Sequence, residues 1–86
     1  MEFNKEGKIC RYYNLDDILK LDLDETIKDH FKKKFGKRVY FDSNGSCKVG
    51  KLCGLEKNYK LSMIYYIIDV KDRRMFIPIN QSITTL

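Results

Sequence analysis

Residues Gly45–Glu56 read GSCKVGKLCGLE, and this stretch decides the fold that the sequence predicts. It follows Asn44, and an Asn-Gly pair readily adopts the positive φ angles of a two-residue hairpin turn. We therefore expect the stretch to be the long second strand of a hairpin. Gly50 and Gly54 interrupt it, and glycines inside a strand mark a bulge or a sharp bend. A strand bent in this way is typical of a small, closing β-barrel.

The chain before this strand carries a helical pattern. Apolar residues recur every four positions and form one stripe on a helix: Leu23, Ile27, Phe31 and Phe35. Gly36 stands where a left-handed C-cap is expected, and Asn14 can cap a shorter helix before the stripe. The sequence therefore predicts that residues 14–36 are helical, and that residues 1–13 are flexible or form a short strand.

From Lys37 onward the apolar period changes to two, which indicates strands. Val39 and Phe41 share one face of a strand over residues 38–42, and further strands are expected over 61–68, 74–79 and 82–86. Residues 61–68 are almost continuously apolar, as in a strand covered on both faces. Pro78 lacks a backbone donor and marks the end or edge of its strand.

The whole chain, residues 1–86, is predicted to be one domain of the α+β class that is mostly β. We expect N-terminal helices to pack on a small, strongly bent, five-stranded antiparallel barrel over residues 37–86. In such a fold the helical stripe covers the barrel core.

Composition limits the classes of function. Lys and Arg number 17 against 12 Asp and Glu, and the formal net charge of +5 favours anionic partners such as nucleic acid. Cys10, Cys47 and Cys53 are odd in number and lack a CxxC spacing, which argues against a disulfide framework. His30 is the only histidine, too few for a zinc site. No apolar run reaches a bilayer span and no signal peptide begins the chain, so we expect a soluble cytoplasmic protein without a membrane partner.

No catalytic constellation is visible in the sequence. Gly45, Gly50 and Lys51 have the spacing of a phosphate-binding loop, but Leu52 stands where Ser or Thr is required. The acidic residues form no pair suited to acid–base chemistry. We therefore expect neither enzymatic activity nor a cofactor.

The predicted order of helix and strands, with its bent second strand, resembles the Sm-like family, which includes bacterial Sm-like RNA chaperones. The likeness is best over residues 36–61. The residues that resemble the first Sm motif are Gly45, Gly50, Lys51, Leu52, Glu56 and Asn58.

The resemblance also implies site residues. In the Sm-like family the turn after this strand helps to build an RNA-binding pocket, which implies a binding role for Asn58 and Tyr59. The second Sm motif has an Arg/Lys-Gly pair, and here Met75 follows Arg74 where the glycine is expected. Arg74 alone is carried over from that motif.

Basic residues interleaved with aromatic residues carry the site prediction, because basic side chains neutralise phosphates and exposed rings stack on bases. The predicted nucleic-acid-binding residues are Lys48, Lys51, Lys57, Asn58, Tyr59, Lys60 and Arg74. A solvated lysine face over an aromatic core explains the same pattern about equally well.

Two classes of function remain open. The first is a small Sm-like module that binds RNA or another single-stranded nucleic acid. The alternative is a protein-binding module, such as a phage-encoded, anti-CRISPR-type inhibitor of a host nucleoprotein, which fits the small size and the absence of a catalytic motif. A homo-oligomer is compatible with both classes, because an exposed edge strand can pair with a copy of itself.

Overall fold

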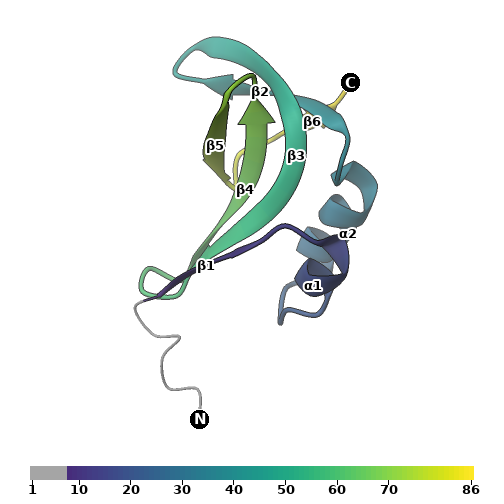
Figure 1. Cartoon of the computed structure of the whole chain (residues 1–86), viewed down its shortest axis with the longest axis vertical. Coiled ribbons are helices and arrows are strands. Elements are labelled where there is room, and N and C mark those ends of the chain that lie inside the picture. The colour runs from purple at the N-terminus through teal and green to yellow at the C-terminus, as the bar shows by residue number, and fades with distance from the viewer. Residues whose placement is uncertain (1–7) are drawn as a thin grey trace.

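The computed structural model describes residues 8–86, which form two helices and six strands (Figure 1). In chain order these are β1 (Ile9–Tyr12), α1 (Leu15–Leu19), α2 (Glu25–Lys34), β2 (Arg38–Ser43), β3 (Ser46–Asn58), β4 (Met63–Val70), β5 (Arg73–Pro78) and β6 (Thr84–Thr85). None of the helices within residues 8–86 is long and apolar enough to cross a bilayer.

All six strands belong to one antiparallel sheet with the order β5-β4-β3-β2-β6, and β1 pairs with β3 off this path. The predicted mostly β fold with N-terminal helices is confirmed. The sheet is open, however, because β5 and β6 are its two ends and do not pair. The closed five-stranded barrel is therefore not observed. The sixth strand is β1, within the segment expected to be flexible or a short strand, whereas residues 1–7 lie outside the described residues.

Strand β3 pairs with β1, β2 and β4 and is curved along its length (Figure 1). Its first half pairs with β2 and its last four residues pair with β1 on the same edge. The ladder to β4 shifts register between Leu52 and Gly54, which confirms the predicted bulge at a glycine. A Cβ atom at Gly54 would lie 2.6 Å from the carbonyl oxygen of Tyr12, so only glycine allows this close approach.

The two helices cover one face of the sheet and close the hydrophobic core. Phe31 of α2 is fully buried, and its ring centroid lies 5.4 Å from that of Tyr66 on β4. The predicted inward positions on β2, Val39 and Phe41, are also buried. Ile67 points to the opposite face from Tyr66 and is fully buried too. The apolar run of β4 is thus covered on both faces, as predicted.

Local hydrogen bonds decide where the elements begin and end. Asn14 caps α1 as predicted, because its side chain accepts from the backbone N–H of Asp16 at 2.8 Å. Asp24 caps α2 in the same way, so residues 14–36 contain a short helix and a longer one, as predicted. The strand expected over residues 61–68 starts later, because β3 continues to Asn58 and the turn after it covers residues 59–62, where Ser62 has a φ of +54°. Strand β4 therefore begins at Met63.

We expect the change Phe31→Ala to lower the free energy of unfolding by about 3–5 kcal/mol, because it removes a fully buried ring and leaves a cavity. A urea titration measures this change. The matched control is Phe76→Ala, which removes a phenylalanine ring that is 36% exposed and should cost less than half as much. Equal losses in the two variants would show that α2 does not cover the core.

Candidate nucleic-acid interface

The structure does not bring the seven predicted site residues together. Lys48 and Lys51 lie in the first half of β3, whereas the predicted segment 57–60 lies at its far end, in the turn to β4. Asn58 lies ten positions after Lys48 in the strand, which corresponds to roughly 30 Å along the chain. Arg74 lies on a third element, β5. Of the seven residues, only Lys48 and Lys51 line the hollow that is described next.

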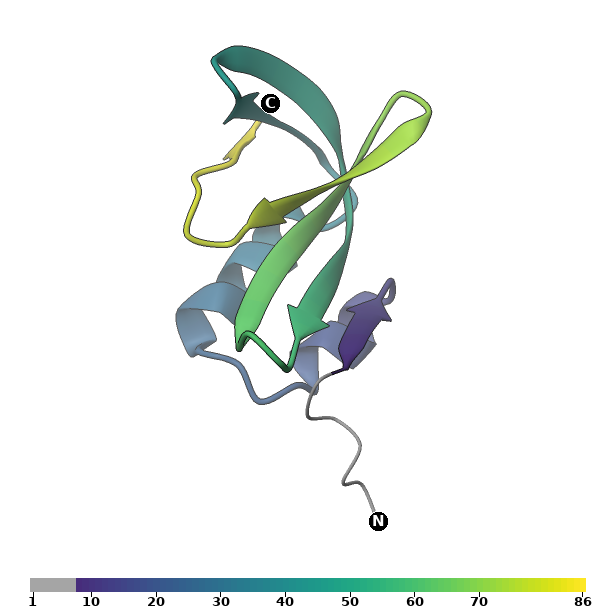
Figure 2. The same ribbon diagram turned by 90° about the vertical axis from the view of Figure 1, so that its left-hand side faces the viewer.

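A hollow of about 790 Å³ lies between the β2–β3 hairpin and the β4–β5 turn. Figure 2 shows that the tips of these two hairpins diverge at one end of the molecule. We call the hollow the basic concavity. The residues that line it are Arg38, Cys47, Lys48, Val49, Gly50, Lys51, Asp69, Val70, Lys71, Asp72, Arg73 and Met75.

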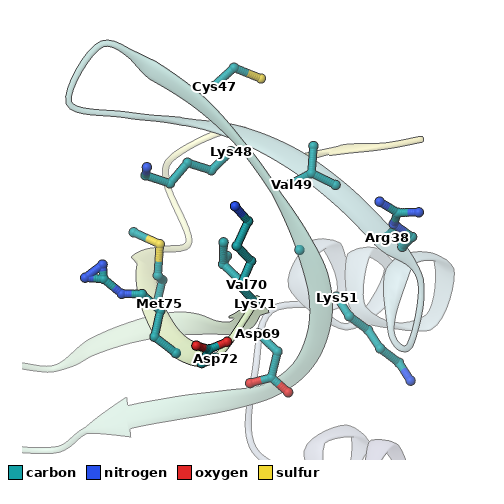
Figure 3. A pocket seen from close by; sticks show the side chains of 12 residues that line it. Arg38, Cys47, Lys48, Val49, Lys51, Asp69, Val70, Lys71, Asp72 and Met75 are labelled. Carbon is teal, nitrogen blue, oxygen red and sulfur yellow. The ribbon is translucent and has the colours of Figure 1, made fainter.

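Unequal strand lengths create the basic concavity. Strand β2 pairs with β3 from Ser46, whereas β4 reaches β3 only from Lys51 onward. Residues 46–50 of β3 therefore have a strand on one edge only, and the hollow lies beside the other edge. In Figure 3, Lys48 and Lys71 project into the hollow from facing elements, and Lys51 extends away from it at the far rim.

The charge of the basic concavity is strongly unbalanced. Its acidic residues are two, Asp69 and Asp72, and its basic residues are five, Arg38, Lys48, Lys51, Lys71 and Arg73. Asp69 is already paired with Arg74, at 3.1 Å. Within residues 8–86, none of the five basic side chains takes part in an ion pair. The positive charge of this surface favours anionic ligands.

Three of these basic residues were not assigned to the site from the sequence: Arg38, Lys71 and Arg73. The hairpin could have revealed Arg38, because counting outward from the two-residue turn at Asn44 places it opposite Lys51, as observed. Lys71 and Arg73 could not be placed in this way. Their position depends on where β4 meets β3, and that is decided by tertiary packing.

The far end of β3 has a compact turn of its own. The side-chain oxygen of Asn58 accepts hydrogen bonds from the backbone N–H groups of Lys60 and Leu61, both at 3.1 Å. The ammonium nitrogen of Lys57 lies 4.8 Å from the ring centroid of Tyr59. Burial, and then a hydrogen bond with Tyr59, raise the pKa of Tyr12. These contacts give the turn residues a structural role.

Arg74 is engaged on the face of the sheet opposite α2. Its Nε donates to Asp69 at 3.1 Å, and its Nη1 donates to the hydroxyl of Tyr13 at 3.1 Å. The hydrogen bond with Asp69 is the main reason that the pKa of Arg74 is raised. On the same face, Nε of Arg11 donates to the buried carboxylate of Glu56 at 2.8 Å, which raises the pKa of Arg11.

The part of the chain that the structure describes holds no cluster of metal ligands, and its Cys53 thiol is not activated. Within it, no group of three or more His, Cys, Asp or Glu side chains could hold a metal ion. Burial, and then the negative charge of Asp69, raise the pKa of the Cys53 thiol. A raised pKa keeps this thiol protonated at neutral pH, where the thiolate is the reactive form.

Comparisons of the chain with protein-family models, with curated proteins and with solved structures found no match. The chemistry of the basic concavity is therefore the ground on which a function is proposed.

One residue of the basic concavity lies in a strained backbone conformation. Lys71 has a φ of +57°, in the left-handed region that asparagine adopts more readily than lysine. We expect Lys71→Asn to raise the free energy of unfolding by roughly 0.5–1 kcal/mol. Lys60→Asn is the control, because Lys60 is an exposed turn lysine without a positive φ. Chemical denaturation measures the free energy of unfolding of both variants. A Lys71→Asn variant that is no more stable than Lys60→Asn would contradict the prediction.

Proposed function

We propose that this chain is a small, non-enzymatic module that binds single-stranded RNA, with the basic concavity as its phosphate-binding surface. One observation carries the proposal. Five basic side chains without an ion-pair partner in residues 8–86 line one hollow of about 790 Å³. Proteins bind nucleic-acid backbones through such clusters, because each phosphate that is neutralised releases a counterion.

The shape of the basic concavity favours a single strand as the ligand. The hollow is open to solvent and is bordered by two hairpins rather than enclosed, so a flexible chain can pass through it. Its basic residues come from β2, β3, the β4–β5 turn and β5. Phosphates along a bending single strand can follow these separate elements.

The proposal includes an open, Sm-like arrangement of β2–β6. Its support is the strand order: β2, β3, β4 and β5 are successive antiparallel neighbours, and β6 returns to pair with β2 through Val39 and Thr85. The bulge in β3 allows a local bend and a stronger twist of the sheet, as a curled arrangement requires.

A binding titration tests the phosphate-binding surface. Labelled single-stranded RNA of about 12 nucleotides should bind at low salt, and the affinity should fall steeply between about 50 mM and about 200 mM salt. Replacement of both Lys48 and Arg73 by Gln should weaken binding. The plot of the logarithm of the binding constant against the logarithm of the salt concentration should also become less steep, by roughly 0.7 for each phosphate that the variant no longer neutralises. Fluorescence anisotropy measures both quantities.

The control for this titration is Lys20→Gln, which removes an exposed charge at the end of α1, away from the basic concavity. It should leave the salt slope unchanged. An equal effect of Lys20→Gln would show that only net charge matters. The absence of RNA binding by the unaltered protein at low salt would refute the proposed function, and labelled single-stranded DNA in parallel shows whether the sugar matters.

A protein partner is the second candidate, because residues 46–50 of β3 have an edge without a neighbouring strand. Such an edge can accept an extended segment of another chain through backbone hydrogen bonds. This arrangement would suit the protein-binding, inhibitor-type alternative. A stable complex with one protein, together with no affinity for RNA in the titration above, is the result that would favour it. Light scattering would show whether the partner is a second copy.

A further inference from the structure

The face of the sheet opposite α2 carries two arginines, each stacked on an aromatic ring. The guanidinium carbon of Arg11 lies 5.0 Å from the ring centroid of Phe76, and that of Arg74 lies 4.7 Å from the ring centroid of Tyr13. We call these four residues the stacking platform. They come from β1, from the residue that follows it and from β5, so β3 and β4 lie between the contributing segments.

The side chains of the stacking platform are held in place by hydrogen bonds. Glu56 fixes Arg11 at 2.8 Å, and Asp69 fixes Arg74 at 3.1 Å. Gly54 leaves room for the ring of Tyr13, since a Cβ atom there would lie 3.0 Å from a ring carbon. Little conformational freedom remains to be lost when a ligand stacks on these groups.

Two carboxylates neutralise the two arginines, so this surface differs in kind from the basic concavity. It offers few net charges for phosphates, but it exposes planar groups to solvent. The side chains of Arg11 and Arg74 are 50% and 52% exposed, and Tyr13 and Phe76 are 44% and 36% exposed. Unstacked nucleobases bind to such surfaces, on aromatic rings and on guanidinium planes.

The stacking platform adjoins the basic concavity. Lys51, Asp69 and Arg74 stand opposite one another in the neighbouring strands β3, β4 and β5. Because adjacent strands lie about 4.8 Å apart, Arg74 is within roughly 10 Å of Lys51 across the sheet. A single nucleic-acid chain can therefore contact both surfaces at the same time.

We propose that the stacking platform binds nucleobases of the same RNA strand whose phosphates occupy the basic concavity. This inference rests on the proposed function and adds to it a base-dependent contribution to affinity. In this arrangement the basic concavity contacts the backbone and the stacking platform contacts the bases. Stacking is tolerant of sequence, because every base has a flat face.

Two ligands distinguish the contributions of the two surfaces to binding. One is labelled oligouridylate, and the other is an abasic oligonucleotide of the same length, which keeps the phosphates and lacks the bases. Phe76→Leu should weaken binding of the oligouridylate by roughly 5-fold to 100-fold and leave binding of the abasic strand unchanged. Arg11→Lys is the second variant. It keeps the positive charge beside Glu56 but removes the planar guanidinium, and it should show the same selective loss.

Two controls accompany these variants in the anisotropy titrations. Leu61→Ala alters a leucine that is 58% exposed in the distant β3–β4 turn and should change neither affinity. The double replacement of Lys48 and Arg73 by Gln should weaken the binding of both ligands to the same extent, because it removes contacts to phosphates and both ligands carry phosphates. Thermal melts show whether each variant is folded, and Arg11→Lys decides the question if Phe76→Leu is not.

Each outcome has a definite meaning. Selective loss of oligouridylate binding supports the stacking platform. Equal loss for both ligands, or no loss for either in a folded variant, overturns it while the phosphate-binding surface stands. If neither ligand binds the unaltered protein, the proposed function fails and the stacking platform fails with it.

Discussion

The close packing of backbone against β3 at its two glycines is the constraint on which the rest of the structure depends. At Gly50 the carbonyl group of Asp69, and at Gly54 that of Tyr12, occupy the space that a Cβ atom would need. This lets β4 and β1 pair closely with a curved strand that carries a bulge between Leu52 and Gly54. The two halves of this long strand can then pair with different strands on the same edge, the first half with β2 and the end with β1.

The bend also determines where the two proposed binding surfaces lie. Because β4 joins β3 only after the first five residues, the β2–β3 hairpin projects past the β4–β5 turn and the basic concavity forms between them. On the other face, the same bend brings the residues around Tyr13 over Gly54 and close to β5. One of the two surfaces thus carries five basic side chains without an ion pair among residues 8–86, and the neighbouring surface carries neutralised arginines with exposed rings.

In the proposed binding of RNA, the two surfaces contribute to the affinity in different ways, and their contributions depend differently on salt. Charges without partners act on phosphates through a long-range field that salt screens. Stacked groups act at contact and depend little on salt. A domain of 86 residues buries only a modest core. The two proposed binding surfaces consist of strand edges and half-exposed side chains, which lie outside that core. Phe31, Tyr66 and their neighbours remain on the covered side of the sheet.

Local chemistry made part of this protein predictable from sequence. The turn at Asn44 and the capping by Asn14 depend on neighbouring residues, and the burial of Val39, Phe41 and Phe31 follows from periodicity, so these predictions were confirmed. Periodicity does not state how far one strand extends along another. The predicted closure of the sheet into a barrel was therefore not observed. Periodicity also gave no means of knowing that Lys57 lies far from Lys48 while Lys71 lies near it. Those relations depend on pairing between distant segments, which only the tertiary structure decided.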